Sequence, residues 1–400
     1  MPVYDARARA SKSDENFPLL TVQPVCNGAR FQTGLFLCAG RAIDGEVLAQ
    51  VLHEHNLLES LHRLPCVVAA DPLQLTPEFA ASLPERRLLL QIPLAAAVDA
   101  ANHEHLQALH AAGCSLMAAQ LPEPDAVVPD CISALFIADP QQAQAAAHSE
   151  WLRRLPGPHM TLLPPGARPG FAAGFAWFAG YEALPDLPRL KGDPIRRSML
   201  LELLALVTQD AATSAIEAHI KRNTGISYQL LKLVNSVSFS ASHKINSFSQ
   251  AITMLGRRQL QRWLQLLLYS RPQDNKEPNP LMSRAAARSA LMEKLAQQRG
   301  GDGGLQDRAF MVGMFSLLDI LFGSPLEEII TPLHLADDVV AALLRKEGGL
   351  GDLLALAIAG EGQPGPALEE ALARNHISHR QWSIAAAAQT NWTVCVCSEA

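Results

Sequence analysis

The sequence predicts a chain of two parts, an α/β barrel followed by an all-helical domain. Within residues 1–185, short apolar runs alternate with amphipathic segments, as in βαβ units built around a parallel sheet. Residues 185–195 contain three prolines and a glycine, a composition that favours a linker, and we place this linker at 186–195. Over residues 196–400, apolar residues recur at helical spacing in one segment after another.

The first part has the element order of a barrel. Strands are expected at 19–25, 34–37, 66–70, 88–92, 115–120, 134–137 and 160–163, and helices at 45–61, 95–112 and 141–154. Similar pieces joined by short links favour a closed barrel over an open sheet. Because an eightfold TIM barrel usually needs about 250 residues, we expect a truncated, distorted TIM-like barrel.

The second part is a series of helices around one densely patterned stretch, residues 225–263. Helices are expected at 196–208, 212–224, 228–237, 249–269, 282–299, 306–321, 325–330, 337–346 and 351–360. An apolar stripe that includes Leu230 and Val234 predicts a buried helix face. Ser249 is a plausible N-cap, and Gly256 could end the helix that follows it.

The composition limits the classes of function. Hydrophobic residues make up 48% and charged residues 18% of the 400 residues, which is typical of a globular protein. A formal charge of −6 argues against broad nucleic-acid binding. Because no apolar run reaches ~18 residues, we expect no membrane span. Seven scattered cysteines and a start without an apolar signal segment favour reduced thiols and a cytoplasmic location.

Three motifs in the patterned stretch resemble the signature of the HDOD domain. They are LLKLVNS at 230–236, KINSFSQAITMLG at 244–256 and RRQLQRW at 257–263. This family is an all-helical relative of the HD phosphohydrolases that lacks their metal ligands. The resemblance implies that residues 196–400 form an HDOD domain. In the helix where HD enzymes carry their His-Asp pair, Ser316 and Leu317 stand instead, which implies that no metal is held there.

The first part is similar to a degenerate EAL domain, the barrel that hydrolyses cyclic di-GMP, in the form found fused to HDOD domains. The landmarks are the strand at 88–92, the segment 113–121 and the segment GFAWFAGY at 174–181. The resemblance implies a distorted EAL barrel over residues 1–185. It also suggests cyclic di-GMP as a ligand.

The positions at which an EAL enzyme carries carboxylates hold other residues here. Gln91, Ala118 and Ala119 stand where the resemblance implies metal ligands, and none of them supplies a carboxylate oxygen. Two-metal phosphodiester hydrolysis needs several carboxylates around hard cations. Arg41 remains at the place of a basic residue, so nucleotide binding without hydrolysis stays open.

These patterns predict a non-catalytic signal-transduction protein that acts by protein–protein interaction, with no cofactor and no enzymatic activity. The alternative is an effector that binds cyclic di-GMP without hydrolysing it. An enzyme of altered metal dependence and a nucleic-acid adaptor are weaker alternatives. The partners would be other signalling proteins, and the sequence indicates neither a particular one nor an oligomeric state. The candidate contact residues are Asn235, Ser236, Lys244, Arg257 and Arg258; Asn235 could instead cap a helix end.

Overall fold

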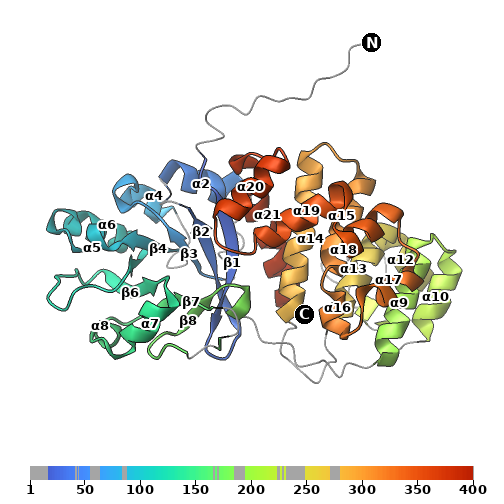
Figure 1. Cartoon of the computed structure of the whole chain (residues 1–400), viewed down its shortest axis with the longest axis horizontal. Helices are drawn as coiled ribbons and strands as arrows, with labels where there is room; N and C mark the ends of the chain where they lie inside the picture. The colour runs from blue at the N-terminus through green and yellow to red at the C-terminus, as the bar shows by residue number, and fades with distance from the viewer. Residues whose placement is uncertain are drawn as a thin grey trace, which may run out of the picture. The chain divides into compact units, whose positions relative to one another are not determined.

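The computed structural model consists of a closed barrel and a helical unit (Figure 1). The described residues are 17–40, 43, 45–54, 64–82, 88–164, 167–168, 171–183, 194–222, 226–227, 229–230, 248–270 and 280–399. The predicted fold class, an α/β barrel with a C-terminal all-helical part, is confirmed.

The barrel strands follow one another around the barrel in chain order. They are β1 (Leu20–Asn27), β2 (Gln32–Ala39), β3 (Cys66–Ala69), β4 (Leu88–Pro93), β5 (Ser115–Ala119), β6 (Ile132–Ile137), β7 (Met160–Leu162) and β8 (Trp177–Ala179). Strands β2 to β8 pair in parallel, whereas β1 runs antiparallel to both of its neighbours. The carboxyl ends of β2 to β8 therefore surround the start of β1.

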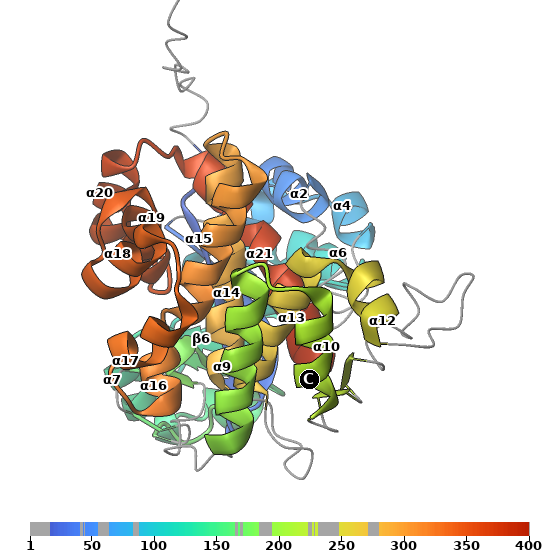
Figure 2. The same cartoon turned by 90° about the vertical axis from the view of Figure 1, so that its right-hand side faces the viewer.

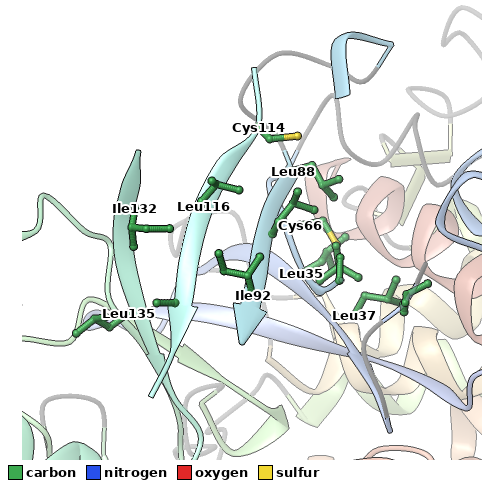
Figure 3. Packing of buried hydrophobic residues seen from close by; sticks show 14 of the residues in the cluster. Leu35, Leu37, Cys66, Leu88, Ile92, Cys114, Leu116, Ile132 and Leu135 are labelled. Carbon is green, nitrogen blue, oxygen red and sulfur yellow. The ribbon is translucent and has the colours of Figure 1, made fainter. Parts of the chain in front are cut away.

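Alternate strand residues serve two separate cores, because successive side chains of a strand point to opposite faces. The inner core fills the barrel with Val25, Phe36, Cys38, Val67, Leu89, Met117, Ala134, Phe136, Met160 and Ala179. The outer core, which includes Leu35, Leu37, Leu88 and Ile92, packs beneath the surrounding helices (Figure 3). Burial on both faces explains why the strands form near-continuous apolar runs in the sequence.

Short helices connect the parallel strands on the outside of the barrel. They are α2 (Gly45–Glu54), α4 (Pro77–Ala81), α5 (Leu94–Val98), α6 (His103–Ala111), α7 (Pro140–Ala145) and α8 (Trp151–Arg154), with short 3-10 turns between some of them. The single helices predicted at 95–112 and 141–154 are wrong. Asp99 and Ser149 accept backbone N–H groups of the next turn, from Ala101 and Trp151 respectively, and so start new helical segments.

The helical unit contains α9 (Pro194–Thr208), α10 (Thr213–Lys221), α12 (Phe248–Leu255), α13 (Arg257–Tyr269), α14 (Pro280–Gln298), α15 (Gly303–Phe315), α16 (Leu318–Phe322), α17 (Leu326–Ile330) and α18 (Asp337–Arg345). Helices α14 and α15 lie side by side at its centre (Figure 2). The predicted helix at 249–269 is divided at Gly256 into α12 and α13.

The chain divides into compact units at places that differ from the predicted domain ends. Residues 1–186 and 355–399 form one unit and residues 187–354 the other. The helical domain predicted over 196–400 is thus longer than the compact helical unit. The division falls inside α19 (Gly348–Ala359), and α20 (Pro366–Arg374) and α21 (His379–Glu399) belong with the barrel.

Within the described residues, no single helix has both the length and the apolar composition to cross a membrane. One sharply bent pair, Gly303–Phe322 with Leu326–Leu333, meets the length and composition criteria only when the two are taken together.

The close approach of α14 and α15 yields a test of the helical core. A Cβ atom at Gly313 would lie 2.6 Å from both Cα and N of Ser289, so any side chain there must push two backbones apart. We expect Gly313→Ala to lower the free energy of unfolding by about 1–3 kcal/mol, measured by urea denaturation. Gly303→Ala, on the same helix with no atom within 4 Å of the new Cβ, is the control and should be close to neutral. Equal stability of the two variants would contradict this packing.

Candidate functional site

The carboxyl-terminal mouth of the barrel is the first candidate site, since parallel barrels build their sites at this end of the strands. The alternation that defines the inner core directs Cys38, Gln91, Ala119 and Leu162 into this mouth from the ends of β2, β4, β5 and β7. Thr21 joins them because antiparallel β1 begins here, opposite Cys38.

Ala118 and Ala119, two of the positions where the resemblance implies metal ligands, lie on opposite faces of β5. Ala119 faces the mouth, but Ala118 is fully buried in the outer core. Adjacent residues of a strand point to opposite faces, so the pair cannot both line the barrel interior. Ala118 therefore does not face the mouth, whereas Gln91 and Ala119 do.

The four strand-end side chains that face the mouth, Cys38, Gln91, Ala119 and Leu162, carry no charge. The side-chain oxygen of Gln91 is buried without a hydrogen-bond partner. Among the described residues, no group of three or more His, Cys, Asp or Glu side chains could hold a metal ion. Arg41 lies outside the described residues, as do several residues that follow β7. In its described part, the mouth offers hydrogen-bonding groups rather than metal ligands.

The thiols around the barrel are held in the neutral form. Burial raises the pKa of Cys38 far above its usual range, although the neighbouring Thr21 hydroxyl acts in the opposite direction. Burial likewise raises the pKa of Cys66 to about 12 and that of Cys114 to about 11. Five cysteines are free and buried, namely Cys26, Cys38, Cys66, Cys114 and Cys131. They are therefore poor nucleophiles in the folded chain.

A buried histidine, which sequence reasoning missed, fixes the start of β7. The Nδ1 atom of His159 accepts the N–H of Leu135 at 3.1 Å, and its Nε2 donates to the carbonyl of Leu152 at 3.1 Å. Burial lowers the pKa of His159, so the imidazole stays neutral and keeps both roles. It positions two strands and does not face the mouth.

The second candidate site is the junction between α15 and α16, where the sequence predicted a lost metal pair at Ser316 and Leu317. Ser316 donates to the carbonyl of Gly313 at 2.7 Å and accepts from Nη1 of Arg288 at 2.9 Å. Leu317 is buried. Arg288 is also buried, so a guanidinium group stands beside the serine hydroxyl. These contacts hold α14 to α15 and supply no metal ligand.

The predicted contact residues divide into two groups. Asn235, Ser236 and Lys244 lie outside the described residues. Arg257 bonds the carboxylate of Asp210 at 3.0 Å and the carbonyl of Ala211. Arg257 is the first residue of α13, the helix that also contains Arg258.

Arg258 belongs to a network that joins α13 to α14 and α15. It contacts Asp307 at 2.6 Å and Glu293 at 3.3 Å, and Arg262 bonds the same two carboxylates. The guanidinium of Arg262 also lies 4.4 Å from the ring centre of Phe310. Arg258 remains about half exposed, so its ion pairs contribute little to stability.

An HDOD domain is present at residues 194–322, the part of the chain that matches the model of the HDOD domain family. This is the part of the chain that carries α9 to α16, and it includes the motifs on which the HDOD resemblance was based. The match ends before α17, and so it covers neither α20 nor α21.

Two curated proteins are similar to part of the chain. Cyclic di-GMP phosphodiesterase CdgJ of Vibrio cholerae is 32% identical over 186 residues, which are 46% of this chain and 43% of CdgJ. The uncharacterized protein YuxH of Bacillus subtilis is 33% identical over 144 residues, 35% of this chain and 34% of YuxH. The chain thus spans less than half the length of these relatives.

Three solved structures show distant likeness. The EAL domain of Mycobacterium smegmatis DcpA has 16% identity and a TM-score of 0.32, over 42% of this chain and 91% of that one. The EAL-like protein YdiV has 16% identity and a TM-score of 0.29, over 44% and 94%. An HDOD domain protein of Geobacter sulfurreducens has 15% identity and a TM-score of 0.30, over 50% and 86%.

The similarity to CdgJ corrects one prediction from the sequence. We expected no enzymatic activity, because Gln91, Ala118 and Ala119 cannot ligate a metal. A relative at 32% identity is named as a phosphodiesterase, and this overturns that expectation. That expectation depended on the lack of carboxylates at only three positions, and one of them, Ala118, does not face the mouth. A relation to cyclic di-GMP signalling is supported.

Proposed function

We propose that the chain is a regulatory protein of cyclic di-GMP signalling, in which the barrel binds the nucleotide and the HDOD region contacts a protein partner. The similarity to CdgJ is the observation that carries the nucleotide part of the proposal. The HDOD match at 194–322 supports a second functional region separate in sequence from the barrel.

The mouth of the barrel has a group suited to a purine ligand. The buried oxygen of Gln91 lacks a donor, and an unsatisfied acceptor of this kind costs stability until a donor reaches it. A guanine base carries N–H donors that complement an amide oxygen. Arg41, which follows β2 in the sequence, is the cation that we expect to pair with a phosphate group.

Calorimetric titration with cyclic di-GMP tests the nucleotide part. We expect saturable binding that Gln91→Leu weakens at least tenfold, about 1.4 kcal/mol, because the substitution removes the acceptor while keeping similar volume. The fold should tolerate this change, since the oxygen it removes has no partner. The titration measures binding of cyclic di-GMP because an effector and a phosphodiesterase must both bind this nucleotide.

The control for this titration is Gln297→Leu, at an exposed position on α14 of the helical unit. It should leave the affinity unchanged. Absence of binding to the wild-type chain, or equal affinities of the wild type and Gln91→Leu, would contradict the proposal.

The partner part of the proposal rests on the exposed side of α13. Arg257 and Arg258 are 37% and 48% exposed, and their carboxylate contacts can exchange for acidic groups of a partner at small cost. Asn235, Ser236 and Lys244 precede α13 in the sequence and stay predicted contact residues.

Quantitative affinity capture from cells that make the protein tests this surface. We expect the double variant Arg257→Gln with Arg258→Gln to capture at least fivefold less of a protein that the wild type retains specifically. The reason is that both cations of the contact are removed. Arg345→Gln is the control, since Arg345 is also exposed and ion-paired, at 2.7 Å to Glu347, but lies on α18. If the double variant retains the same proteins in the same amounts, the proposed surface is wrong.

A further inference from the structure

The barrel is incompletely paired along one side of β1. Strand β8 pairs with β1 only from Val25 to Asn27, and the N–H of Gly180 then bonds the carbonyl of Pro24 at 3.0 Å. Beyond this point β8 has ended, while β1 continues back to Leu20. The side of β1 that faces away from β2 is therefore a strand edge at the mouth, and an open edge of this kind needs hydrogen-bond partners.

Helix α21 supplies those partners. Trp382 donates from Nε1 to the carbonyl of Leu20 at 2.7 Å, and the N–H of Leu20 donates to the hydroxyl of Ser383 at 3.0 Å. The same hydroxyl donates to the carbonyl of Pro18 at 2.9 Å. Trp382 and Ser383 are both buried. Two side chains of α21 thus bond the backbone groups of Leu20, which β8 does not reach.

The loop that precedes α20 packs closely against the indole ring of Trp382. A Cβ atom at Gly360 would lie 2.3 Å from two ring carbons of Trp382, so only glycine allows the chain to pass over the indole. Ala387, one turn beyond Ser383, lies in the outer core of the barrel. The segment is therefore packed as well as hydrogen-bonded.

The same loop lies at the barrel mouth. The side chain of Gln23 faces the barrel interior from β1 and donates to the carbonyl of Glu361 at 3.2 Å. The loop also approaches the residue that directly follows β2. Its Pro364 lies 3.9 Å from the position that a Cβ would take at Gly40. One hydrogen bond from β1 and the close approach of Pro364 to the residue after β2 place this loop at the rim of the mouth.

We propose that residues 355–390 form a strap that completes the edge of β1 and covers one side of the barrel mouth, so that release of the strap exposes the mouth. The pairing of β1 with β2 over Leu20 to Cys26 does not involve the strap, so the barrel stays closed on that side when the strap detaches. The inference concerns the shape of the barrel and does not depend on the proposed nucleotide.

Alkylation of Cys38 by iodoacetamide in the folded full-length chain tests the strap, with each cysteine followed by peptide mass spectrometry. Cys38 faces the inner core at the mouth, opposite Thr21, and is 2% exposed. We expect Ser383→Ala to raise its labelling rate about tenfold, because the N–H of Leu20 and the carbonyl of Pro18 both lose their partner. Gln23→Leu, which removes only the link to Glu361, should give a smaller increase.

Cys114 and Cys131 are internal controls, since both are buried and both precede their strands at the opposite end of the barrel. Their labelling should not change. Glu369→Gln, at an exposed position of α20, should leave Cys38 protected. Wild-type labelling of Cys38 in both strap variants would overturn the proposal. So would a joint rise of Cys38, Cys114 and Cys131 in Ser383→Ala if Gln23→Leu had no effect.

Discussion

The hydrogen bonds between Leu20 and α21 complete the barrel. Strand β1 is antiparallel to both neighbours, and its first half extends beyond the end of β8. Without partners, the backbone groups of Leu20 would be buried and unpaired, at a cost of about 1–3 kcal/mol each. Trp382 and Ser383 remove that cost, and in doing so they bring the last part of the chain into the barrel unit.

This constraint also determines what surrounds the mouth. Gln23 and Glu361 meet on one side of it, and Gln91 and Ala119 reach it from other strands. The side chains that face it from the ends of β2, β4, β5 and β7 are uncharged, whereas the arginine-rich helix α13 belongs to the HDOD region. Ligand binding and partner binding are therefore assigned to different units, and the strap belongs to the unit with the mouth.

The parts of the fold that depend on local pattern could be predicted from the sequence. The apolar runs predicted β2 to β6 within a few residues, since burial on both faces leaves a continuous signal. The period of two would also have separated Ala118 from Ala119, but the two were treated as a pair. Breaks such as that at Asp99 were missed because a capping side chain overrides the helical period.

The contact between Leu20 and Trp382 could not be predicted in this way, because 362 positions separate the two residues in the sequence. No local pattern shows that β8 is short or that β1 has a free edge. Near the C-terminus the sequence predicted only a short pair of helices, whereas α21 spans His379–Glu399 and groups with the barrel. Function was harder still, since missing carboxylates were taken to exclude an activity that the name of a relative supports.

The most direct test of this account is amide hydrogen exchange at Leu20 in the full-length chain. In the wild type, the Leu20 amide should be protected as strongly as its β1 neighbours that bond to β2, because its N–H donates to Ser383. In Ser383→Ala it should exchange at least tenfold faster, while the amides paired between β1 and β2 keep their protection. Exchange at Leu20 that is unchanged by the substitution would contradict the central claim that α21 completes the barrel.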